Sequence, residues 1–264
     1  ECTVDSRSIE NWKEIQGHSL KTFVEDFEVF EQYIVVQEKE NGLTQLRVHD
    51  TQNGGSKVVP PREETYMMYI GTNPTMEQQT VRIGYSSMTT PHSVIDVDLS
   101  TFEEEVKKQR EVLGEFDSAN YKSERIWATA TDGTKVPISL VYHKDRFAKD
   151  GSAPVLLYAY GSYGSTVDPY FSSVRLSLLN RGYAFALAHI RGGEYMGHQW
   201  YENGKLLNKK NTFTDFIDCG EHLIKEGYCH SDKLFAMGGS AGGLLMGAIS
   251  NMRPDLWKGI VSAV

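Results

Sequence analysis

The sequence is poor in cysteine and has no long apolar run. Its three cysteines, Cys2, Cys219 and Cys229, cannot all pair, and none lies in a C-x-x-C arrangement. We therefore expect free thiols, no metal site and a reducing, cytoplasmic setting. No stretch is long and apolar enough to span a bilayer, and residues 1–5 are polar with no apolar core after them. Neither a membrane span nor a signal peptide is expected.

Positive charge is also scarce. Lys and Arg number 27 against 35 Asp and Glu, which gives a formal net charge of −8. Phosphate binding needs a basic face, so nucleic acid is not expected as the main partner. An acidic surface is compatible with cationic substrates, although an ordinary solvated surface explains it equally well. The chain does not start with Met, and we expect it to be a fragment of a longer protein.

The first part of the chain reads as short strands separated by turns. Strands are expected at 33–37 and 43–48, joined at Asn41-Gly42, and again at 65–72, 81–88 and 93–99. Regular groups of four strands are typical of propeller blades, and a β-sandwich remains open. Residues 102–117 are rich in charge and indicate an edge strand or a linker. We place the domain boundary after residue 118.

Beyond that boundary, strands alternate with helices. Asp132-Gly133 predicts a hairpin, and 154–160 has the apolar character of a strand buried on both faces. A helix is expected over 171–179 and a strand over 183–190. A second helix is expected to open with Thr212 and Asp215 in capping-box spacing. This order is typical of an α/β fold.

Residues 232–251, DKLFAMGGSAGGLLMGAISN, are the centre of the pattern. An apolar strand runs into Gly238-Gly239-Ser240-Ala241-Gly242 and then into a stretch with helical spacing. G-x-S-x-G between a strand and a helix is the nucleophile elbow of an α/β-hydrolase, which exposes the serine hydroxyl. A simple Gly/Ser-rich turn is the alternative. The elbow predicts Ser240 as a nucleophile.

The chain supplies no recognisable base for that serine. In the α/β-hydrolase order an acid and then a histidine follow the nucleophile. All eight histidines, at positions 18, 49, 92, 143, 189, 198, 222 and 230, precede Ser240. We expect the acid and the histidine beyond the end of this chain, and we expect these 264 residues alone to be inactive.

Three long motifs carry a family resemblance: AYGSYG at 159–164, HIRGGEYMGHQWYENGKLLNKKNTFTDF at 189–216, and GGSAGGLLMG at 238–247. Together they resemble the prolyl oligopeptidase family of serine peptidases, and within it the oligopeptidase B branch. The resemblance implies the fold class: a β-propeller, C-terminal blades only, followed by an α/β-hydrolase domain, N-terminal half only. Residues 1–118 would end the propeller, and 119–264 would begin the catalytic domain.

The resemblance also implies roles for individual residues. Ser240 would be the nucleophile, and the Ala241 N–H with the Tyr160 hydroxyl would form the oxyanion hole. Without the family, Tyr160 reads as a strand-end tyrosine with its hydroxyl in solvent. Asp168 matches the first position of an Asp-x-Asp substrate-binding pattern whose second position is Tyr170 here. A turn-forming role before the following proline is the alternative for Asp168.

The resemblance implies cleavage of short peptides after Arg or Lys, with no cofactor. A post-proline peptidase or an esterase of the same fold remains open, as does an inert interaction module. The sequence does not indicate an oligomeric state. From the residues themselves, we expect Arg191 and Glu194 to form a structural pair, and the basic run 205–210 to be a solvated face.

Overall fold

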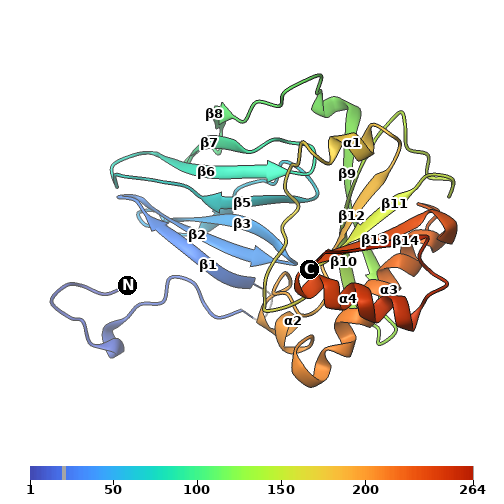
Figure 1. Cartoon of the computed structure of the whole chain (residues 1–264). Coiled ribbons are helices and arrows are strands. Elements are labelled where there is room, and N and C mark those ends of the chain that lie inside the picture. Colours follow the sequence, from blue (N-terminus) through green and yellow to red (C-terminus); the bar gives the residue numbers. More distant parts are fainter. Residues whose placement is uncertain (20–21, 264) are drawn as a thin grey trace.

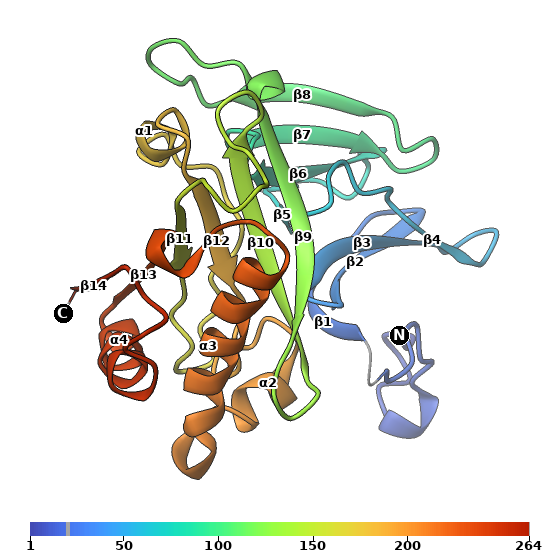
Figure 2. The ribbon, with the colours of Figure 1, turned by 90° about the vertical axis from the view of Figure 1, so that its right-hand side faces the viewer.

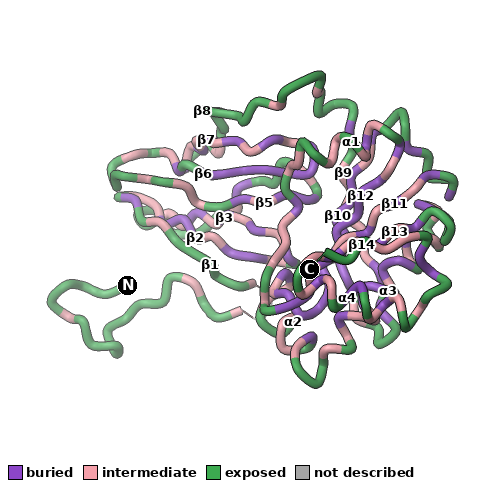
Figure 3. The backbone as a smooth tube through the Cα atoms, viewed as in Figure 1, coloured by how far each residue is buried: buried purple, intermediate pink, exposed green. Residues whose placement is uncertain are grey.

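The computed structural model describes residues 1–19 and 22–263. Two regions lie side by side (Figure 1): two small sheets formed by the first part of the chain, and a larger sheet with helices formed by the rest. Buried residues gather within the sheets and on the inner sides of the helices, whereas the first residues of the chain are mostly exposed (Figure 3). No described helix is long and apolar enough to cross a membrane.

The first small sheet is an antiparallel meander. Its strands pair in sequence order: β1 (Thr22–Val29), β2 (Tyr33–Glu40), β3 (Leu43–Asp50) and β4 (Ser56–Val58). The predicted β2–β3 hairpin is present, and Asn41 and Gly42 have the positive φ values, 51° and 82°, that its two-residue turn needs. The sequence does not predict β1, because a bulge between Val24 and Asp26 breaks its two-residue period.

The second small sheet repeats this pattern. It contains β5 (Tyr66–Ile70), β6 (Thr80–Ser87), β7 (Ser93–Asp98) and β8 (Glu104–Gln109), again antiparallel and in sequence order. β7 alternates buried and half-buried residues, and β8 is exposed throughout, as an edge strand rich in Glu and Lys should be. One apolar core, which includes Val35, Leu46 and Ile83, is shared by the two sheets.

The expected fold class needs a correction. We expected C-terminal propeller blades, but both four-stranded sheets lie in the N-terminal part of the chain, within residues 22–109. The propeller-type region is therefore the N-terminal unit of this chain. Every blade of a propeller repeats one strand pattern, so that pattern carries no information about the place of a blade in a propeller. The domain boundary after residue 118 stays a prediction.

The larger sheet has six strands in the order β14-β13-β11-β12-β10-β9. The strands are β9 (Tyr121–Thr129), β10 (Lys135–His143), β11 (Val155–Tyr158), β12 (Ala184–Ala188), β13 (Leu234–Gly239) and β14 (Gly259–Ala263). β9 and β10 form the hairpin predicted at Asp132-Gly133, and β10 pairs with β12 antiparallel. The other neighbours are parallel. Parallel β11 and β13 consequently end at the same edge of the sheet.

Helices cover this sheet unequally. The α-helices are α1 (Leu176–Leu179), α2 (His198–Glu202), α3 (Lys210–Lys225) and α4 (Ala241–Met252), with 3-10 turns η1 (Ile9–Asn11), η2 (Ser118–Asn120), η3 (Leu206–Asn208) and η4 (Ser231–Lys233). α3 lies against β9 and β10, and α4 lies against β13 and β14 (Figure 2). α1 packs on the opposite face, where Leu179 meets Phe185 and Leu187 of β12.

Two helix predictions are wrong in detail. The helix expected over 171–179 is only the single turn of α1, preceded by a loop. α3 begins at Lys210, so Thr212 and Asp215 lie inside it and do not form its cap. Both are buried: the Thr212 hydroxyl donates to Arg191 O at 2.8 Å, and Asp215 binds the side chain of Arg191. Their capping-type spacing reflects these tertiary partners.

A chain of buried hydroxyls joins the two regions. The Oγ1 of Thr65, just before β5, lies 2.6 Å from Ser139 Oγ on β10, and that oxygen lies 2.8 Å from His189 Nε2. Burial lowers the pKa of His189 well below its ordinary value. Arg125 on β9 also donates to the backbone carbonyl of Asn41 in the β2–β3 turn. These contacts fix the first sheet and the second sheet against the larger one.

Candidate active site

Ser240 is the single residue between the end of β13 and the start of α4, where the chain turns sharply. Its backbone angles are φ 52° and ψ −121°, a region that a residue with a side chain rarely adopts. The residue is exposed, and its hydroxyl has no hydrogen-bond partner among the described residues. Strain of this kind persists only where the surrounding structure enforces it. The turn holds Ser240 with a free hydroxyl at the end of β13, the strand next to the edge strand β14.

Two glycines make that turn possible. A Cβ atom on Gly238 would lie 2.4 Å from the carbonyl oxygen of Gly242, and a Cβ on Gly242 would lie 3.0 Å from Ala159 O. The first distance is a direct clash with backbone, and the second is a tight contact with the end of β11. Both glycine positions of G-x-S-x-G are therefore required by close backbone approach.

Backbone N–H groups surround the serine. The N–H of Ser240 donates to Ala263 O on β14 at 2.8 Å, and the N–H of Gly243 donates to Ser240 O at 2.8 Å. The N–H of Ala241, the first residue of α4, has no acceptor among the described residues. A free N–H at a helix start, on the positive end of the helix dipole, is suited to an anionic oxygen. The oxyanion role of Ala241 stays a prediction.

Tyr160 lies beside this turn because β11 and β13 are neighbours. Tyr158 pairs with Met237, so the chain beyond each strand reaches the same edge of the sheet. The Tyr160 side chain is half-buried, and its Cδ2 lies 3.9 Å from the position of a Cβ on Gly242. No described residue hydrogen-bonds its hydroxyl. The structure thus brings Tyr160 and the elbow together, as the oxyanion hypothesis requires.

Asp168 follows on the same loop. Its backbone carbonyl accepts from Tyr170 N at 2.9 Å, but its carboxylate makes no hydrogen bond or ion pair with any described residue. Burial raises the pKa of Asp168, and the nearby Lys39 opposes that effect. The turn-forming alternative stays open, because the bond from Tyr170 N to Asp168 O closes a tight turn around the following proline. The substrate role of Asp168 stays a prediction.

Histidines lie elsewhere. His189 is bound to Ser139, and His198 lies 2.9 Å from Glu194 and 3.1 Å from Glu202. No histidine of the described residues forms a hydrogen bond with Ser240. The described residues also contain no group of three potential metal ligands. The described chain brings together the exposed hydroxyl of Ser240, the free N–H of Ala241 and the side chain of Tyr160, and no described histidine lies within hydrogen-bond reach to activate the serine.

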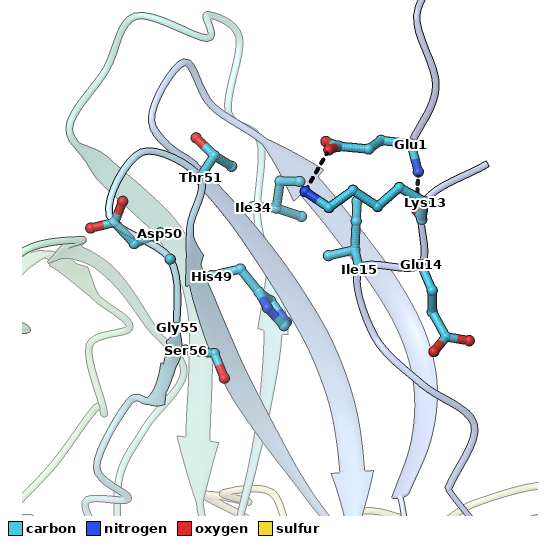
Figure 4. A pocket seen from close by; sticks show the side chains of 11 residues that line it. Glu1, Lys13, Glu14, Ile15, Ile34, His49, Asp50, Thr51, Gly55 and Ser56 are labelled. Carbon is cyan, nitrogen blue, oxygen red and sulfur yellow. Dashed lines mark hydrogen bonds and ion pairs between the residues drawn. The ribbon is translucent and has the colours of Figure 1, made fainter. Parts of the chain in front are cut away.

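One pocket far from the elbow gathers polar side chains. It lies between the N-terminal segment and the first sheet (Figure 4), has a volume of about 400 Å³, and contains the Lys13–Glu1 ion pair. His49 in this pocket lies 3.0 Å from Gln16 Oε1, and burial lowers its pKa. Ser56 lies opposite His49 on β4, but the hydrogen bond of the His49 ring is with Gln16 and not with that serine.

Sequence reasoning missed the partners of two basic residues, Arg191 and Lys209. Arg191 does not pair with Glu194; its guanidinium binds Asp215 and, at 2.6 Å, Asp132. Lys209 is half-buried, so the run 205–210 is not uniformly solvated. No local signal reveals either contact, because the partners lie 24 to 59 residues away along the chain.

Comparisons with known proteins match two parts of the chain to one family. The family model of the prolyl oligopeptidase N-terminal beta-propeller domain matches residues 1–110, and the prolyl oligopeptidase family model matches 169–264. The first match confirms the correction made above: the propeller region is the N-terminal one and the hydrolase region follows it.

Individual relatives show the same pattern. "Dipeptidyl aminopeptidase BI" of Pseudoxanthomonas mexicana is 50% identical over 98% of this chain and 36% of its own length. "Protease 2" of Moraxella lacunata is 41% identical over 94% of this chain and 35% of its own. Oligopeptidase B from Trypanosoma brucei, solved in a closed form with covalently bound antipain, is 42% identical with a TM-score of 0.82 over 92% of this chain and 36% of its own.

The chain therefore spans about a third of the length of the curated relatives it matches. Two models of one family cover most of its residues, and Ser240 lies in a strained turn between β13 and α4. The chain belongs to the prolyl oligopeptidase family of serine peptidases.

Proposed function

We propose that Ser240 is the nucleophile of a serine-type oligopeptidase. The observation that carries this proposal is the strained backbone of Ser240, φ 52° and ψ −121°, with its exposed and unpartnered hydroxyl. Strain at one non-glycine residue costs about 1–3 kcal/mol and is typical of functional sites. A plain connecting turn gains nothing from such a conformation.

The chemistry follows from the geometry. Ser240 Oγ attacks the scissile carbonyl, and its proton passes to a general base. The developing oxyanion accepts hydrogen bonds from the Ala241 N–H and the Tyr160 hydroxyl. The tetrahedral intermediate collapses, the protonated amine leaves, and water hydrolyses the acyl-enzyme on Ser240. We propose that the acid and the histidine base come from residues outside these 264, so the chain alone is inactive.

We propose that the substrates are short peptides cleaved after Arg or Lys. The resemblance to oligopeptidase B supports this specificity, and the unpaired carboxylate of Asp168 supports a subsite for a second basic side chain. Tyr170 replaces the second acidic residue of the pattern, so this subsite would hold one carboxylate only. A propeller beside the catalytic domain would allow only peptides without folded structure to reach the active site. The division of the two domains at residue 118 belongs to this proposal.

A dipeptidyl aminopeptidase is the second candidate. The relative with that name is 50% identical over nearly the whole chain. Such an enzyme releases dipeptides and therefore needs the free amino terminus of its substrate. Proteins named prolyl endopeptidase are 38% identical over 66% of this chain, which keeps post-proline cleavage as a third outcome of the test.

Three amide substrates separate these activities in the complete gene product: an amino-blocked arginyl amide, a dipeptidyl amide with a free amino terminus, and an amino-blocked prolyl amide. Our proposal expects fast turnover of the first, abolished by Ser240→Ala. Preference for the second or third would replace the specificity and keep the nucleophile. Turnover that survives Ser240→Ala would overturn the proposal. The Asp168 subsite predicts that Asp168→Asn raises KM for a diarginyl amide and not for an alanyl-arginyl amide.

The proposed setting is cytoplasmic. Cys219 and Cys229 are buried and unpaired, and burial raises the pKa of both thiols. Free buried thiols are usual where the surroundings are reducing. No partner other than the peptide substrate is proposed.

A further inference from the structure

Lys209 lies directly behind the loop that carries Tyr160. It is the last residue before α3, and its ammonium donates to the carbonyl oxygen of Gly161 at 2.6 Å and to Ser162 Oγ at 2.7 Å. The side chain is half-buried, and burial lowers its pKa. No carboxylate of the described chain forms an ion pair with it. Its ammonium is thus partnered by two neutral oxygens of one loop.

That loop has an unusual backbone. Gly161, Tyr163 and Gly164 have φ values of 67°, 58° and 66°, so three of four consecutive residues are in the left-handed region. A Cβ on Gly161 would lie 2.6 Å from Thr212 Cγ2, which places this residue against the first turn of α3. A non-glycine residue such as Tyr163 holds this conformation only when other contacts enforce it. The two bonds from Lys209 supply such contacts.

An ammonium without a counter-ion is a costly way to hold a loop. Removing a charge from water is unfavourable unless its hydrogen bonds compensate, and two neutral acceptors compensate only in part. The neighbouring lysines avoid this cost, since Lys205 pairs with Glu202 and Lys210 is exposed. The position of Lys209 therefore favours a role beyond solubility.

We propose that Lys209 is a positioning residue that holds the Gly161–Ser162 backbone so that the Tyr160 hydroxyl stays aimed at the oxyanion. This inference rests on the proposed role of Tyr160. Gly161 is the next residue along the chain, so fixing its carbonyl limits rotation of the Tyr160 backbone. The start of α4, at Gly242, restricts Tyr160 from the other side. The positive charge behind the loop also favours an anion in front of it.

The test compares Lys209→Met with Lys210→Met in the complete gene product. Methionine keeps the length of the side chain and removes both donated bonds. Loss of one oxyanion-hole donor reduces kcat by roughly 10²–10³-fold. A Tyr160 hydroxyl that is present but less well positioned should therefore reduce kcat by a smaller factor, about 10- to 100-fold. KM should change by less than about twofold, because the oxyanion forms only after binding. Lys210→Met should match the wild type, and Lys209→Arg, which keeps a cationic donor, should recover part of the loss.

A second background separates positioning from general damage. In Tyr160→Phe the hydroxyl is gone, so adding Lys209→Met should reduce kcat by less than about threefold further. Effects that multiply fully would show that Lys209 acts independently of Tyr160 and would overturn the inference. So would a loss that appears in KM, or equal effects of Lys209→Met and Lys210→Met. If Lys209→Met does not fold, Lys209→Gln takes its place in both comparisons. An inert Tyr160→Phe would instead refute the proposed oxyanion hole, which is a separate outcome.

Discussion

The carboxylate of Asp215 on α3 accepts three hydrogen bonds from a single residue, Arg191. The guanidinium donates through Nε at 2.9 Å and through a terminal nitrogen at 2.5 Å, and the backbone N–H of Arg191 donates at 3.0 Å. Asp215 is fully buried and Arg191 nearly so. The loop after β12 is thereby fixed to the helix that also begins beside Lys209.

Breaking this pair should destabilise the fold strongly. Asp215→Ala leaves a buried guanidinium with only Asp132, a loss of about 3–5 kcal/mol in the free energy of unfolding. Asp255→Ala is the matched control, since its pair with Arg253 is exposed and should contribute about 0–1 kcal/mol. Urea denaturation of the complete gene product measures both. If both variants lose the same free energy of unfolding, the buried pair stabilises the fold no more than the exposed pair does.

A second prediction compares a glycine of the elbow, Gly238, with a glycine in the middle of α4, Gly247. Gly238→Ala places a Cβ within 2.4 Å of backbone and should cost about 1–3 kcal/mol of stability. Gly247→Ala, in the exposed middle of α4 with no atom within 4 Å of the new Cβ, should instead gain about 1 kcal/mol. Thermal unfolding compares the two variants. A harmless Gly238→Ala would contradict the close packing of strand and helix.

The strain at Ser240 predicts that two inactive variants differ in stability. Ser240→Ala and Ser240→Gly both remove the proposed nucleophile, but only glycine accepts φ 52° and ψ −121° without strain. After allowing for the greater freedom of unfolded glycine, Ser240→Gly should be more stable than Ser240→Ala by about 1 kcal/mol. Denaturation of the two inactive proteins provides the comparison. A less stable glycine variant would argue that the turn is unstrained.

Glu124 predicts a dependence of stability on pH. Its carboxylate accepts from the hydroxyls of Tyr142 and Tyr228, each at 2.6 Å, and lies 2.8 Å from Lys122 Nζ. Burial alone would raise the pKa of Glu124, but these three partners outweigh it and lower the pKa to about 2. A depressed pKa means that the contribution is complete above the unfolded pKa of about 4.3 and is lost as pH falls toward about 2.

Glu124→Gln should accordingly lower the free energy of unfolding by about 2 kcal/mol at pH 7. The difference from the wild type should shrink between about pH 5 and pH 2, where the wild-type carboxylate loses its advantage. Glu105→Gln, at a largely exposed position on β8, serves as the control. A difference that stays constant over this range would show that the ionised form of Glu124 is not what stabilises the fold.

Local signals in the sequence predicted the local features of the site. The elbow at Ser240 and the turns at Asn41-Gly42 and Asp132-Gly133 depend on residues adjacent in the chain, so their patterns are sufficient. These are features that short-range backbone sterics determine. The place of Tyr160 beside the elbow was implied by the family resemblance alone, because β11 and β13 are neighbours in the sheet but distant in the chain.

Contacts between distant residues were not predictable in this way. The capping-type spacing of Thr212 and Asp215 is indistinguishable in sequence from a helix start, yet both side chains bind Arg191. Lys209 reads as one more cation in a basic run, and its acceptors lie 47 and 48 residues earlier. The position of these blades within a propeller was also not predictable, because all blades share the same strand pattern.

The central claim is that Ser240 is the reactive nucleophile, and covalent labelling tests it most directly. The complete gene product is treated with a fluorophosphonate, which forms an ester with an activated serine hydroxyl, and its peptides are analysed by mass spectrometry. We predict one adduct, on the peptide that contains Ser240, with loss of activity in proportion and no adduct in Ser240→Ala. An active protein that is labelled at another residue, or that loses activity while Ser240 stays unmodified, would contradict the account.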